Sequence, residues 1–333
     1  MKKTSMRDIA RAVGVSVVTV SNALGGKPGM SEEMREKIRR VADEMNYDYS
    51  AQNRTYNRHP LDIGILVPDK YFTLTESYYG MMYKELVQQL AAEGHFALLE
   101  ILKPGEEEKL ELPAMIRNRR VDGLILLGES SKAYYRMLAQ CGKPVLFLDF
   151  YDEMGSADSV VGDNTYGCYR LTCHLIKEGH TRIGFVGTPL ATSSIMDRYL
   201  GFYRACLSQG LPLRQEWVLD DRDEAGRIRL PELPEELPDA FVCNCDIVAN
   251  KLIGMLKEKG FRVPEDISVT GFDDFTGGTQ SGPALSTFRM DTNAMIRIAV
   301  RRLSDRCFGS NTLFERIVVS GQPVYRDSDI KRN

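Results

Sequence analysis

Several features that would place this chain in a common class of protein are missing from its sequence. It has four histidines and one tryptophan in 333 residues, and its seven cysteines form no C-x-x-C pair. Closely spaced cysteines and histidines are the usual ligands of a structural zinc ion. Cys243 and Cys245 would share one face of an expected strand, but no further ligand lies near them. We therefore expect free, mostly buried thiols and no metal site.

The sequence also has no long apolar run. No stretch approaches the roughly 18 consecutive apolar residues that a membrane span requires. Lys2 and Lys3 near the start have no apolar core behind them, which is not the pattern of a secretory signal. We expect a cytoplasmic protein with no membrane partner. No GxGxxG or GxxxxGKS/T motif follows an expected strand, so we expect no nucleotide cofactor.

Charge is distributed unevenly along the chain. The net charge is −3, but residues 1–58 carry 11 Lys and Arg against 7 Asp and Glu, a balance of +4. The remaining residues carry 32 basic and 39 acidic side chains, a balance of −7. A basic end on an acidic body suggests a nucleic-acid-binding head joined to a domain with another task. The alternative is an ordinary solvated face.

The first 45 residues have the pattern of three short helices. Ser5, Ser16 and Ser31 are suited to cap them, and Asp8 completes a capping box with Ser5. Gly14 and Val15 form a tight turn before the second helix, which we expect from Val17 to about Leu24. The expected buried positions are Met6, Ile9, Ala10, Val13, Val20, Leu24, Ile38, Val41, Ala42 and Met45.

After a polar linker over 47–60, short apolar runs alternate with amphipathic segments. This β-α-β-α pattern predicts an α/β fold with parallel, doubly wound sheets in two lobes. Fully buried strands are expected at 63–67, 96–100, 123–127 and 145–148, with helices near 79–93, 107–119 and 131–141. A second series has strands at 182–186, 240–243 and 268–272 and helices near 165–178, 197–209 and 246–259. A cleft between the lobes is a natural ligand site, lined by the carboxyl ends of the strands.

Residues 6–24, MRDIARAVGVSVVTVSNAL, resemble the headpiece of the LacI/GalR (lactose/galactose repressor) family of transcriptional regulators. The pattern D-I-A-x-x-x-G-V-S-x-x-T-V-S is specific to that helix-turn-helix. The resemblance implies that the second helix enters the major groove of duplex DNA. It divides the chain into a headpiece at 1–46, a hinge at 47–60 and an effector-binding and dimerisation domain at 61–333. The N-lobe would comprise about 61–160 and 290–320, and the C-lobe about 161–289 and 321–333.

The outward positions of the second helix are the expected DNA contacts. Thr19 and Ser21 have hydroxyls suited to phosphate, and Ser16 stands at the start of the helix. By resemblance, Val17, Val18 and Asn22 read the bases: Asn22 can pair with adenine, and the valines can pack on thymine methyl groups. The alternative for the valines is plain exposure to solvent.

The linker departs from the family pattern P-N-x-x-A-R-x-L, which forms a hinge helix on the operator. Arg54 remains, but the proline is replaced by Tyr49, the alanine by Asn53 and the leucine wedge by Tyr56. Tyr56 can still insert into the minor groove, although its hydroxyl needs a partner. An ordinary linker is the alternative.

The body is similar to the family's effector domain, which resembles periplasmic sugar-binding proteins. The segments that carry this likeness are 163–167, 179–185, 197–202 and 263–274. The resemblance implies that the effector contacts are Tyr78, Tyr79, Asp149, Arg198, Asp246 and Asp273. Carboxylates, a guanidinium and aromatic rings together suit a sugar. Asp246 has a second interpretation as a helix cap, and Tyr78, Tyr79 and Asp149 as core, edge or turn residues. Trp217 is expected at the start of a strand.

Three departures weaken any transfer of the effector's identity. Cys245 stands where the family often has asparagine, Pro231, Pro234 and Pro238 interrupt a usual helix, and Met290 replaces a commonly polar, pocket-facing residue.

The sequence therefore predicts a DNA-binding transcriptional regulator and not an enzyme. We expect a homodimeric repressor of carbohydrate-utilisation genes, bound to a near-palindromic operator and controlled by a small molecule between its lobes, most simply a sugar. One alternative is a solute-binding protein without a DNA function. Another is a regulator of the same family that responds to a metabolite other than a sugar. An enzyme is disfavoured because no nucleophile arrangement accompanies Asp149 and Asp273.

Overall fold

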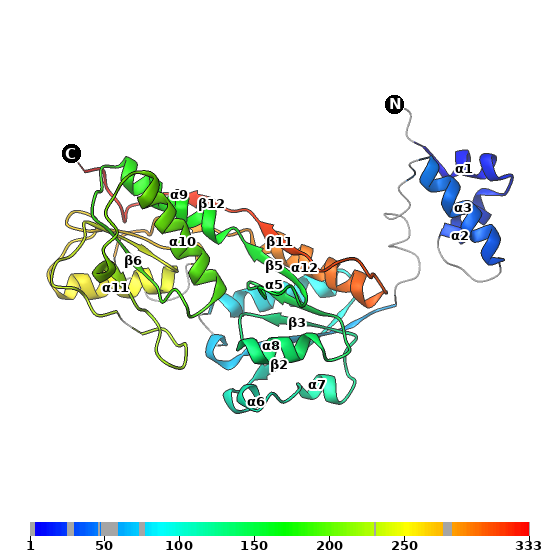
Figure 1. The fold of residues 1–333 in the computed structure, drawn as a ribbon, viewed down its shortest axis with the longest axis horizontal. Coiled ribbons are helices and arrows are strands. Elements are labelled where there is room, and N and C mark those ends of the chain that lie inside the picture. Colours follow the sequence, from blue (N-terminus) through cyan, green and yellow to red (C-terminus); the bar gives the residue numbers. More distant parts are fainter. Residues whose placement is uncertain are drawn as a thin grey trace. The chain divides into compact units, whose positions relative to one another are not determined.

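The computed structural model describes residues 4–24, 30–45, 47, 59–72, 77–229, 231–275 and 282–332. The chain divides into two compact units, Met1–Pro60 and Leu61–Asn333. Figure 1 shows the first as a cluster of helices and the second as sheets with helices around them. Each unit is described by itself.

The N-terminal unit contains the three expected helices, α1 (Met6–Val13), α2 (Val17–Leu24) and α3 (Glu32–Glu44). The N–H of Ser5 donates to the Asp8 carboxylate over 2.9 Å, and the N–H of Thr19 donates to Ser16 Oγ over 3.0 Å. Gly14 ends α1 with a φ of 78°, a left-handed conformation that glycine adopts without strain. These local signals explain why the helix boundaries are predictable from the sequence.

The core of this unit is small and lies where the three helices meet. Its fully buried apolar residues are Ile9, Ala10, Val20, Ala23, Leu24, Ile38 and Ala42. Met6, Val13, Val41 and Met45 were also predicted to be buried but are only partly buried. The buried faces of α1 and α3 are therefore narrower than the sequence predicts. Burial of Ile38 and Ala42 against α2 fixes the face that α2 presents to solvent.

The larger unit is built on a six-stranded parallel sheet and a four-stranded parallel sheet. The six strands lie in the order β11-β5-β4-β3-β1-β2. Their bounds are β1 (Asp62–Pro68), β2 (Phe96–Leu102), β3 (Gly123–Leu127), β4 (Val145–Leu148), β5 (Asp158–Gly162) and β11 (Arg316–Val319). This sheet with its helices is called the N-lobe here.

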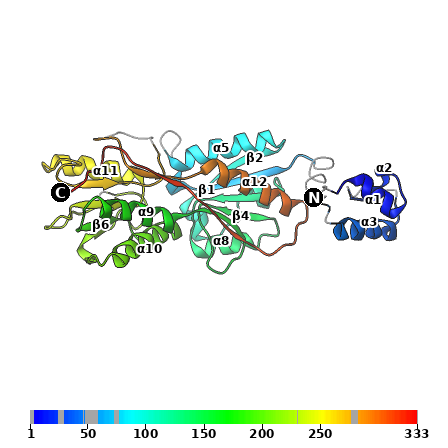
Figure 2. The same ribbon diagram turned by 90° about the horizontal axis from the view of Figure 1, so that it is seen from above.

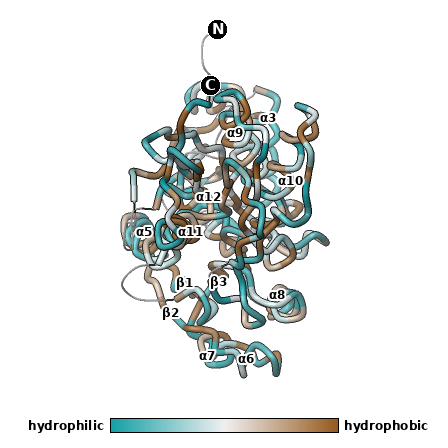
Figure 3. The backbone as a smooth tube through the Cα atoms, turned by 90° about the vertical axis from the view of Figure 1, so that its left-hand side faces the viewer, coloured by the Kyte–Doolittle hydropathy of each residue, from teal (hydrophilic) through white to brown (hydrophobic). Residues whose placement is uncertain are grey.

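Helices cover both faces of the N-lobe sheet, as Figure 2 shows. Ile63 and Ile65 of β1 belong to the same apolar cluster as α5 (Tyr78–Ala92) and α12 (Thr292–Cys307). Leu66 points to the other face and packs with α7 (Ala114–Arg117) and α8 (Lys132–Ala139). Burial on both faces is why the inner strands read as continuous apolar runs. In the tube of Figure 3, hydrophobic and hydrophilic segments alternate along the chain.

The four-stranded sheet, with the order β7-β6-β8-β9, forms the C-lobe. Its strands are β6 (Ile183–Val186), β7 (Val218–Leu219), β8 (Ala240–Cys243) and β9 (Ser268–Thr270). Its helices are α9 (Asn164–Lys177), α10 (Ser193–Ser208) and α11 (Asp246–Glu258). An antiparallel pair, β10 (Thr287–Arg289) and β12 (Gln322–Val324), completes the strands of the described chain. Short helices are η1 (Asp69–Tyr71), η2 (Gln215–Trp217) and α6 (Pro104–Glu108).

Three local predictions are wrong. Strand β2 is not fully buried: it is the sheet edge, and the side chains of Phe96 and Leu98 are 64% and 41% exposed. The single helix expected over 107–119 is divided into α6 and α7, because Pro113 precedes α7 and cannot continue a helix. Cys243 and Cys245 do not share a strand face, since β8 ends at Cys243 and Cys245 is the N-cap of α11.

Trp217 lies directly before β7, as expected for the start of a strand, and is buried. Among the described residues, no helix has both the length and the apolar character that a membrane crossing needs. No three potential metal ligands lie close enough together to hold an ion in the same part of the chain.

Candidate functional site

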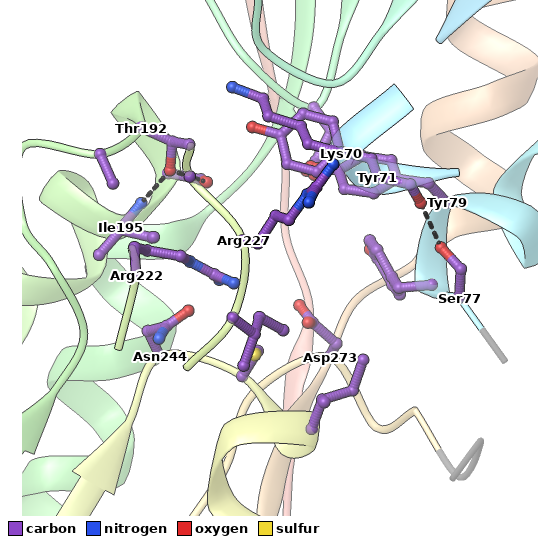
Figure 4. Close-up of a pocket in the computed structure, with 18 of the residues that line it drawn as sticks. Lys70, Tyr71, Ser77, Tyr79, Thr192, Ile195, Arg222, Arg227, Asn244 and Asp273 are labelled. Atoms are coloured by element: carbon purple, nitrogen blue, oxygen red, sulfur yellow. Dashed lines mark hydrogen bonds between the residues drawn. The ribbon is translucent and has the colours of Figure 1, made fainter. Parts of the chain in front are cut away.

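A cavity of about 640 Å³ lies between the N-lobe and the C-lobe. We call it the lobe cavity. Its walls come from the segments that follow β1, β4, β6, β7, β8 and β9. The lobe cavity therefore lies at the carboxyl ends of these parallel strands. Ligands of open α/β sheets bind at that end because the strands stop there and the loops diverge. Figure 4 shows side chains from both lobes pointing into the lobe cavity.

Arg198 of α10 is the buried cation of the lobe cavity. Its guanidinium donates to Asn164 Oδ1 over 2.8 Å, to the carbonyl oxygen of Asn244 over 2.5 Å and to Asp273 Oδ1 over 3.1 Å. The centre of the guanidinium also lies 4.1 Å from the ring centroid of Phe272. These contacts fix a planar donor group in one orientation, ready to bind a further acceptor.

Two carboxylates stand on backbone that few residues adopt. Asp149 follows β4 with a φ of 71°, and Asp273 follows β9 with a φ of 102°. Such left-handed conformations cost free energy and cluster at functional sites. The hydroxyl of Tyr79 donates to Asp149 Oδ2 over 2.9 Å, which holds the carboxylate at the cavity wall.

Burial changes the proton affinity of these carboxylates. Desolvation raises the pKa of Asp273 to about 7; Arg198 opposes the rise, whereas the charge of Asp149 adds to it. Desolvation also raises the pKa of Asp149, against the opposing effects of Arg198 and Tyr79. Perturbed carboxylates in a cleft are typical of a binding or reaction site.

Asp246 binds the side chain of Thr287 and the backbone of Phe275 rather than capping its own helix. It is the first residue of α11, and its carboxylate accepts from Thr287 Oγ1 and from the N–H of Phe275, both over 2.7 Å. Desolvation raises its pKa well above the usual value. The carboxylate therefore orders the loop after β9 at the edge of the lobe cavity.

Among the described residues, one polar group of the lobe cavity has no hydrogen-bond partner. The hydroxyl oxygen of Tyr78 is buried, and no hydrogen-bond partner for it exists among the described residues. Desolvation raises the pKa of Tyr78 well above its usual value, and the charge of Asp149 adds to the effect. An unsatisfied buried hydroxyl costs about 1–3 kcal/mol, so a ligand or a water molecule is expected to supply the missing bond.

The lobe cavity also has an aromatic wall and several cations. Tyr71 and Tyr79 have ring centroids 4.7 Å apart, and the ring of Phe275 meets that of Tyr78 edge-on at 6.2 Å. The lining cations besides Arg198 are Lys70, Arg222, Arg227 and Lys251. Aromatic faces with a few fixed polar groups are typical of a small-molecule site.

The second site is the outer face of α2 in the N-terminal unit. Val18 is 67% exposed although it is apolar, and Val17, Ser16 and Ser21 are exposed as well. The hydroxyls of Ser16 and Thr19 lie 2.8 Å apart at the beginning of the helix. An exposed helix start with adjacent valines and hydroxyls has the chemistry of a groove-reading helix.

Two family models match separate parts of the chain. Residues 5–50 match the model "Bacterial regulatory proteins, lacI family", and residues 172–328 match the model "Periplasmic binding protein-like domain". The first match covers the helix-turn-helix. The second covers most of the C-lobe together with α12 and β11 of the N-lobe. The chain belongs to the LacI family of bacterial regulatory proteins. It is therefore a DNA-binding transcriptional regulator.

Relatives of this LacI-family chain match it over almost its whole length. The ribose operon repressor of Haemophilus influenzae is 27% identical over 330 residues, which are 97% of this chain and 98% of that protein. The HTH-type transcriptional repressor PurR of Erwinia tasmaniensis is 29% identical over 342 residues, again 97% and 98% of the two chains. The structure of the Lac repressor dimer bound to operator and the anti-inducer ONPF has a TM-score of 0.67 at 22% identity, with coverage of 99% of this chain and 100% of that chain.

The six residues predicted to contact an effector of this LacI-family chain all line the lobe cavity. They are Tyr78, Tyr79, Asp149, Arg198, Asp246 and Asp273. Their role as effector contacts stays a prediction. Of the predicted DNA contacts, Ser16, Val17, Val18, Thr19, Ser21 and Asn22 lie on or beside α2, whereas Arg54 and Tyr56 fall outside the described residues.

The expectation for Met290 is wrong. Its side chain does not line the lobe cavity but packs in the main apolar cluster, where Gly162 leaves room for its methyl group. Sequence reasoning also missed Lys70, Tyr71, Arg222, Arg227, Asn244 and Phe275 as lining residues. A usable signal existed for Lys70, since it follows a predicted strand as Asp149 does. No comparable signal marks Arg222, because β7 before it has only two residues.

Proposed function

We propose that this LacI-family regulator is a cytoplasmic, homodimeric repressor of carbohydrate-utilisation genes, and that a sugar bound in the lobe cavity controls its affinity for a near-palindromic operator. The observation that carries the effector part is the convergence of Asp149, Arg198 and Asp273 beside the partnerless hydroxyl of Tyr78. Vicinal sugar hydroxyls both donate and accept, so they match carboxylates, a guanidinium and a free hydroxyl together. The relative named a ribose operon repressor supports the same class of effector.

Dimerisation and operator binding follow from the helix-turn-helix. One α2 reads only a half-site, and two copies related by a two-fold axis read a near-palindrome. The related structure described as a Lac repressor dimer bound to operator supports this assembly. Arg54 and Tyr56 remain candidates for contacts with the DNA between the half-sites. We expect no enzymatic activity: burial raises the pKa of the Cys245 thiol in the lobe cavity to about 12, which disfavours the nucleophilic thiolate.

A second effector class has a specific observation in its favour. The aromatic wall of Tyr71, Tyr79 and Phe275 is compatible with a planar nucleobase. A base needs few carboxylate acceptors, however, and the lobe cavity has Asp149, Asp246 and Asp273 at its wall. This balance of groups favours the sugar.

A thermal-shift screen of the full chain tests the proposal. The compounds are pentoses, hexoses, disaccharides, their phosphate esters and nucleobases. A compound at a hundred times its dissociation constant adds about 2.7 kcal/mol to the stability of the bound unit. We expect a sugar to raise the unfolding temperature, and Arg198→Gln to abolish the rise. A rise in the unfolding temperature with nucleobases alone would reject the sugar as effector and support the second effector class.

A further inference from the structure

Two of the cations in the lobe cavity, Lys70 and Arg222, are poorly paired among the described residues: Lys70 forms no ion pair there, and Arg222 has only Asp221, at 3.5 Å. They come from different lobes: Lys70 lies in η1, directly after β1, and Arg222 lies in a hairpin that follows β7. Figure 4 shows both side chains at the lobe cavity, with Arg222 reaching into it from the C-lobe. The established contacts of Arg198 and Asp273 use neither of them.

The hairpin that carries Arg222 is held rigidly. Arg222 and Ile228 form an antiparallel bridge, and the neighbouring Asp221 is fully buried. The carboxylate of Asp221 accepts from the N–H of Thr188 over 2.9 Å and from Asn244 Nδ2 over 2.6 Å. Because these bonds fix the base of the hairpin, the position of Arg222 at the cavity wall is set by the fold.

The guanidinium of Arg222 is nearly buried and poorly satisfied. Its side chain is 14% exposed, and its nearest acid is Asp221 at 3.5 Å. That distance exceeds the roughly 2.7–2.9 Å of a charge-assisted hydrogen bond, and Asp221 already accepts from Thr188 and Asn244. No side-chain hydrogen bond of Arg222 is present among the described residues, so its donors are available to a ligand.

The ammonium group of Lys70, on the N-lobe side, is also poorly satisfied. Its ammonium lies 4.9 Å from the ring centroid of Tyr71 and forms no ion pair or hydrogen bond within the described chain. The two nearby acids are engaged elsewhere: Glu129 accepts from Ser193 over 2.7 Å, and Glu107 accepts from the N–H of Ser131 over 2.5 Å. Burial lowers the pKa of Lys70, and the charge of Arg222 lowers it further, against the opposing effect of these acids.

The hairpin that carries Arg222 also contacts Lys70. A Cβ placed on Gly226 would lie 3.5 Å from Lys70 Cδ and 3.7 Å from its Nζ, so the hairpin of Arg222 packs directly on Lys70. Buried or half-buried lysine and arginine side chains are normally paired with an acid. Two like charges that face one space repel each other, and an anion between them would turn that repulsion into attraction.

We propose that Lys70 and Arg222 form an anion subsite in the lobe cavity and that the effector is an acidic sugar, with a phosphate or carboxylate group bound by these two residues. This inference rests on the proposed function for the sugar ring, which Asp149, Arg198 and Asp273 would hold. Neutral sugars lack the group that the subsite recognises.

The same geometry links the anion to regulation. Lys70 belongs to the N-lobe and Arg222 to the C-lobe, so an anion touches both only when the lobes are closed. A ligand shifts a conformational equilibrium through its differential affinity for the two states. An acidic sugar therefore favours the closed arrangement more strongly than the neutral sugar from which it derives.

The first experiment uses inorganic phosphate as the probe and needs no knowledge of the sugar. Unfolding of the full chain is followed by the fluorescence of Trp217, the sole tryptophan, which is buried in the C-lobe. We expect millimolar phosphate to raise the unfolding temperature above that in sodium chloride of equal ionic strength. Lys70→Met and Arg222→Gln should lose this difference. Lys257→Met, which removes an exposed charge of α11 outside the lobe cavity, should keep it.

The second experiment compares matched sugars by calorimetric titration: ribose with ribose 5-phosphate, and glucose with glucose 6-phosphate and glucuronate. Loss of one charge-assisted contact weakens binding about tenfold or more. We expect Lys70→Met and Arg222→Gln to weaken binding of the acidic sugar by that factor. The affinity for its neutral counterpart should stay the same. The preferred acidic sugar distinguishes phosphate from carboxylate.

The outcomes separate this inference from the proposed function. Equal phosphate effects in the wild-type chain and in both variants would overturn the anion subsite. Binding of neutral sugars with no gain from an acidic group would also overturn it, while the sugar function stands. A phosphate effect that depends on Lys70 and Arg222, with no binding of any sugar, would uphold the subsite and reject the sugar.

Discussion

Arg198 and Asp273 form an ion pair inside the lobe cavity, with Nη2 and Oδ1 3.1 Å apart and the two side chains 6% and 7% exposed. The pair joins α10 to the segment after β9, so it couples two cavity walls of the C-lobe. Removal of one partner from a buried pair typically costs about 3–5 kcal/mol, because the other charge is left uncompensated. An arginine cannot release its proton, whereas Asp273 takes one up readily at a pKa of about 7.

The raised pKa of Asp273 predicts how stability depends on pH. The pKa is 3.8 for an unperturbed aspartate and about 7 in the folded chain, so between these values the folded state retains a proton that the unfolded state has lost. The free energy of unfolding therefore falls as the pH rises from about 4 to about 7. Asp273→Asn cannot bind this proton, so its stability should fall less steeply. Urea unfolding monitored through Trp217 across this window measures both slopes.

Asp149 and Asp246 also have raised pKa values and remain in that variant, so the slope should shrink without vanishing. Asp266 offers the matched control, because its exposed ion pair with Arg262 lowers the pKa of Asp266 to about 2. Asp266→Asn should leave the slope between pH 4 and 7 unchanged. Identical slopes for the wild-type chain and Asp273→Asn would show that Asp273 does not titrate in this range.

Gly201 allows α10 to pack closely against α9. A Cβ at this position would overlap the carbonyl oxygen of Thr165 and would lie 2.9 Å from the amide nitrogen of Tyr169. Backbone atoms cannot move aside as a side chain does, so Gly201→Ala should destabilise the larger unit by about 1–3 kcal/mol or more. Gly105 of α6 has no atom within 4 Å of its added Cβ, and Gly105→Ala should be neutral or stabilising by up to about 1 kcal/mol. Urea midpoints of the two variants provide the comparison.

The exposed face of α2 predicts which substitutions change sequence recognition. Val18→Ala removes two methyl groups that are mostly in solvent, so the stability of the N-terminal unit should change by less than about 0.5 kcal/mol. If Val18 packs on a thymine methyl group, the preference at that base pair should weaken by about 1–3 kcal/mol. Selection of binding sites from a randomised duplex library measures this preference position by position.

Ser21→Ala is the matched variant on the same helix face. A hydroxyl that binds phosphate carries no sequence information, so its loss should weaken all sites alike and leave the selected sequence unchanged. The assignment of base and phosphate contacts is contradicted if Val18→Ala lowers affinity uniformly or if Ser21→Ala alters the selected sequence.

The parts of this protein that local chemistry determines could be predicted from the sequence. Ser16 caps α2 and Val20 faces the core because capping and a 3.6-residue period act within one helix. Asp149 lies at the lobe cavity because it ends a buried parallel strand, and carboxyl ends of such strands converge. Resemblance to the LacI family supplied all six candidate effector contacts, which are Tyr78, Tyr79, Asp149, Arg198, Asp246 and Asp273.

The parts that depend on tertiary contacts could not be predicted. Strand β5 was missed because Asp158 and Ser159 interrupt its apolar pattern, although the carboxylate of Asp158 is neutralised by Arg302 and Arg306. Arg222 enters the lobe cavity only because a hairpin folds back after a two-residue strand. Met290 turned out to be a core residue because Gly162, far away in the sequence, leaves the space for it.

In the proposed function, a small molecule in the lobe cavity controls binding of α2 to DNA. The most direct test is fluorescence anisotropy of the full chain on a duplex from the library selection, with and without the sugar that the thermal screen identifies. We predict that the sugar changes operator affinity at least fivefold, a typical lower limit for allosteric coupling. Arg198→Gln should bind the same duplex and ignore the sugar. An unchanged operator affinity in saturating sugar, or an equal response of Arg198→Gln, would show that the lobe cavity does not control DNA binding.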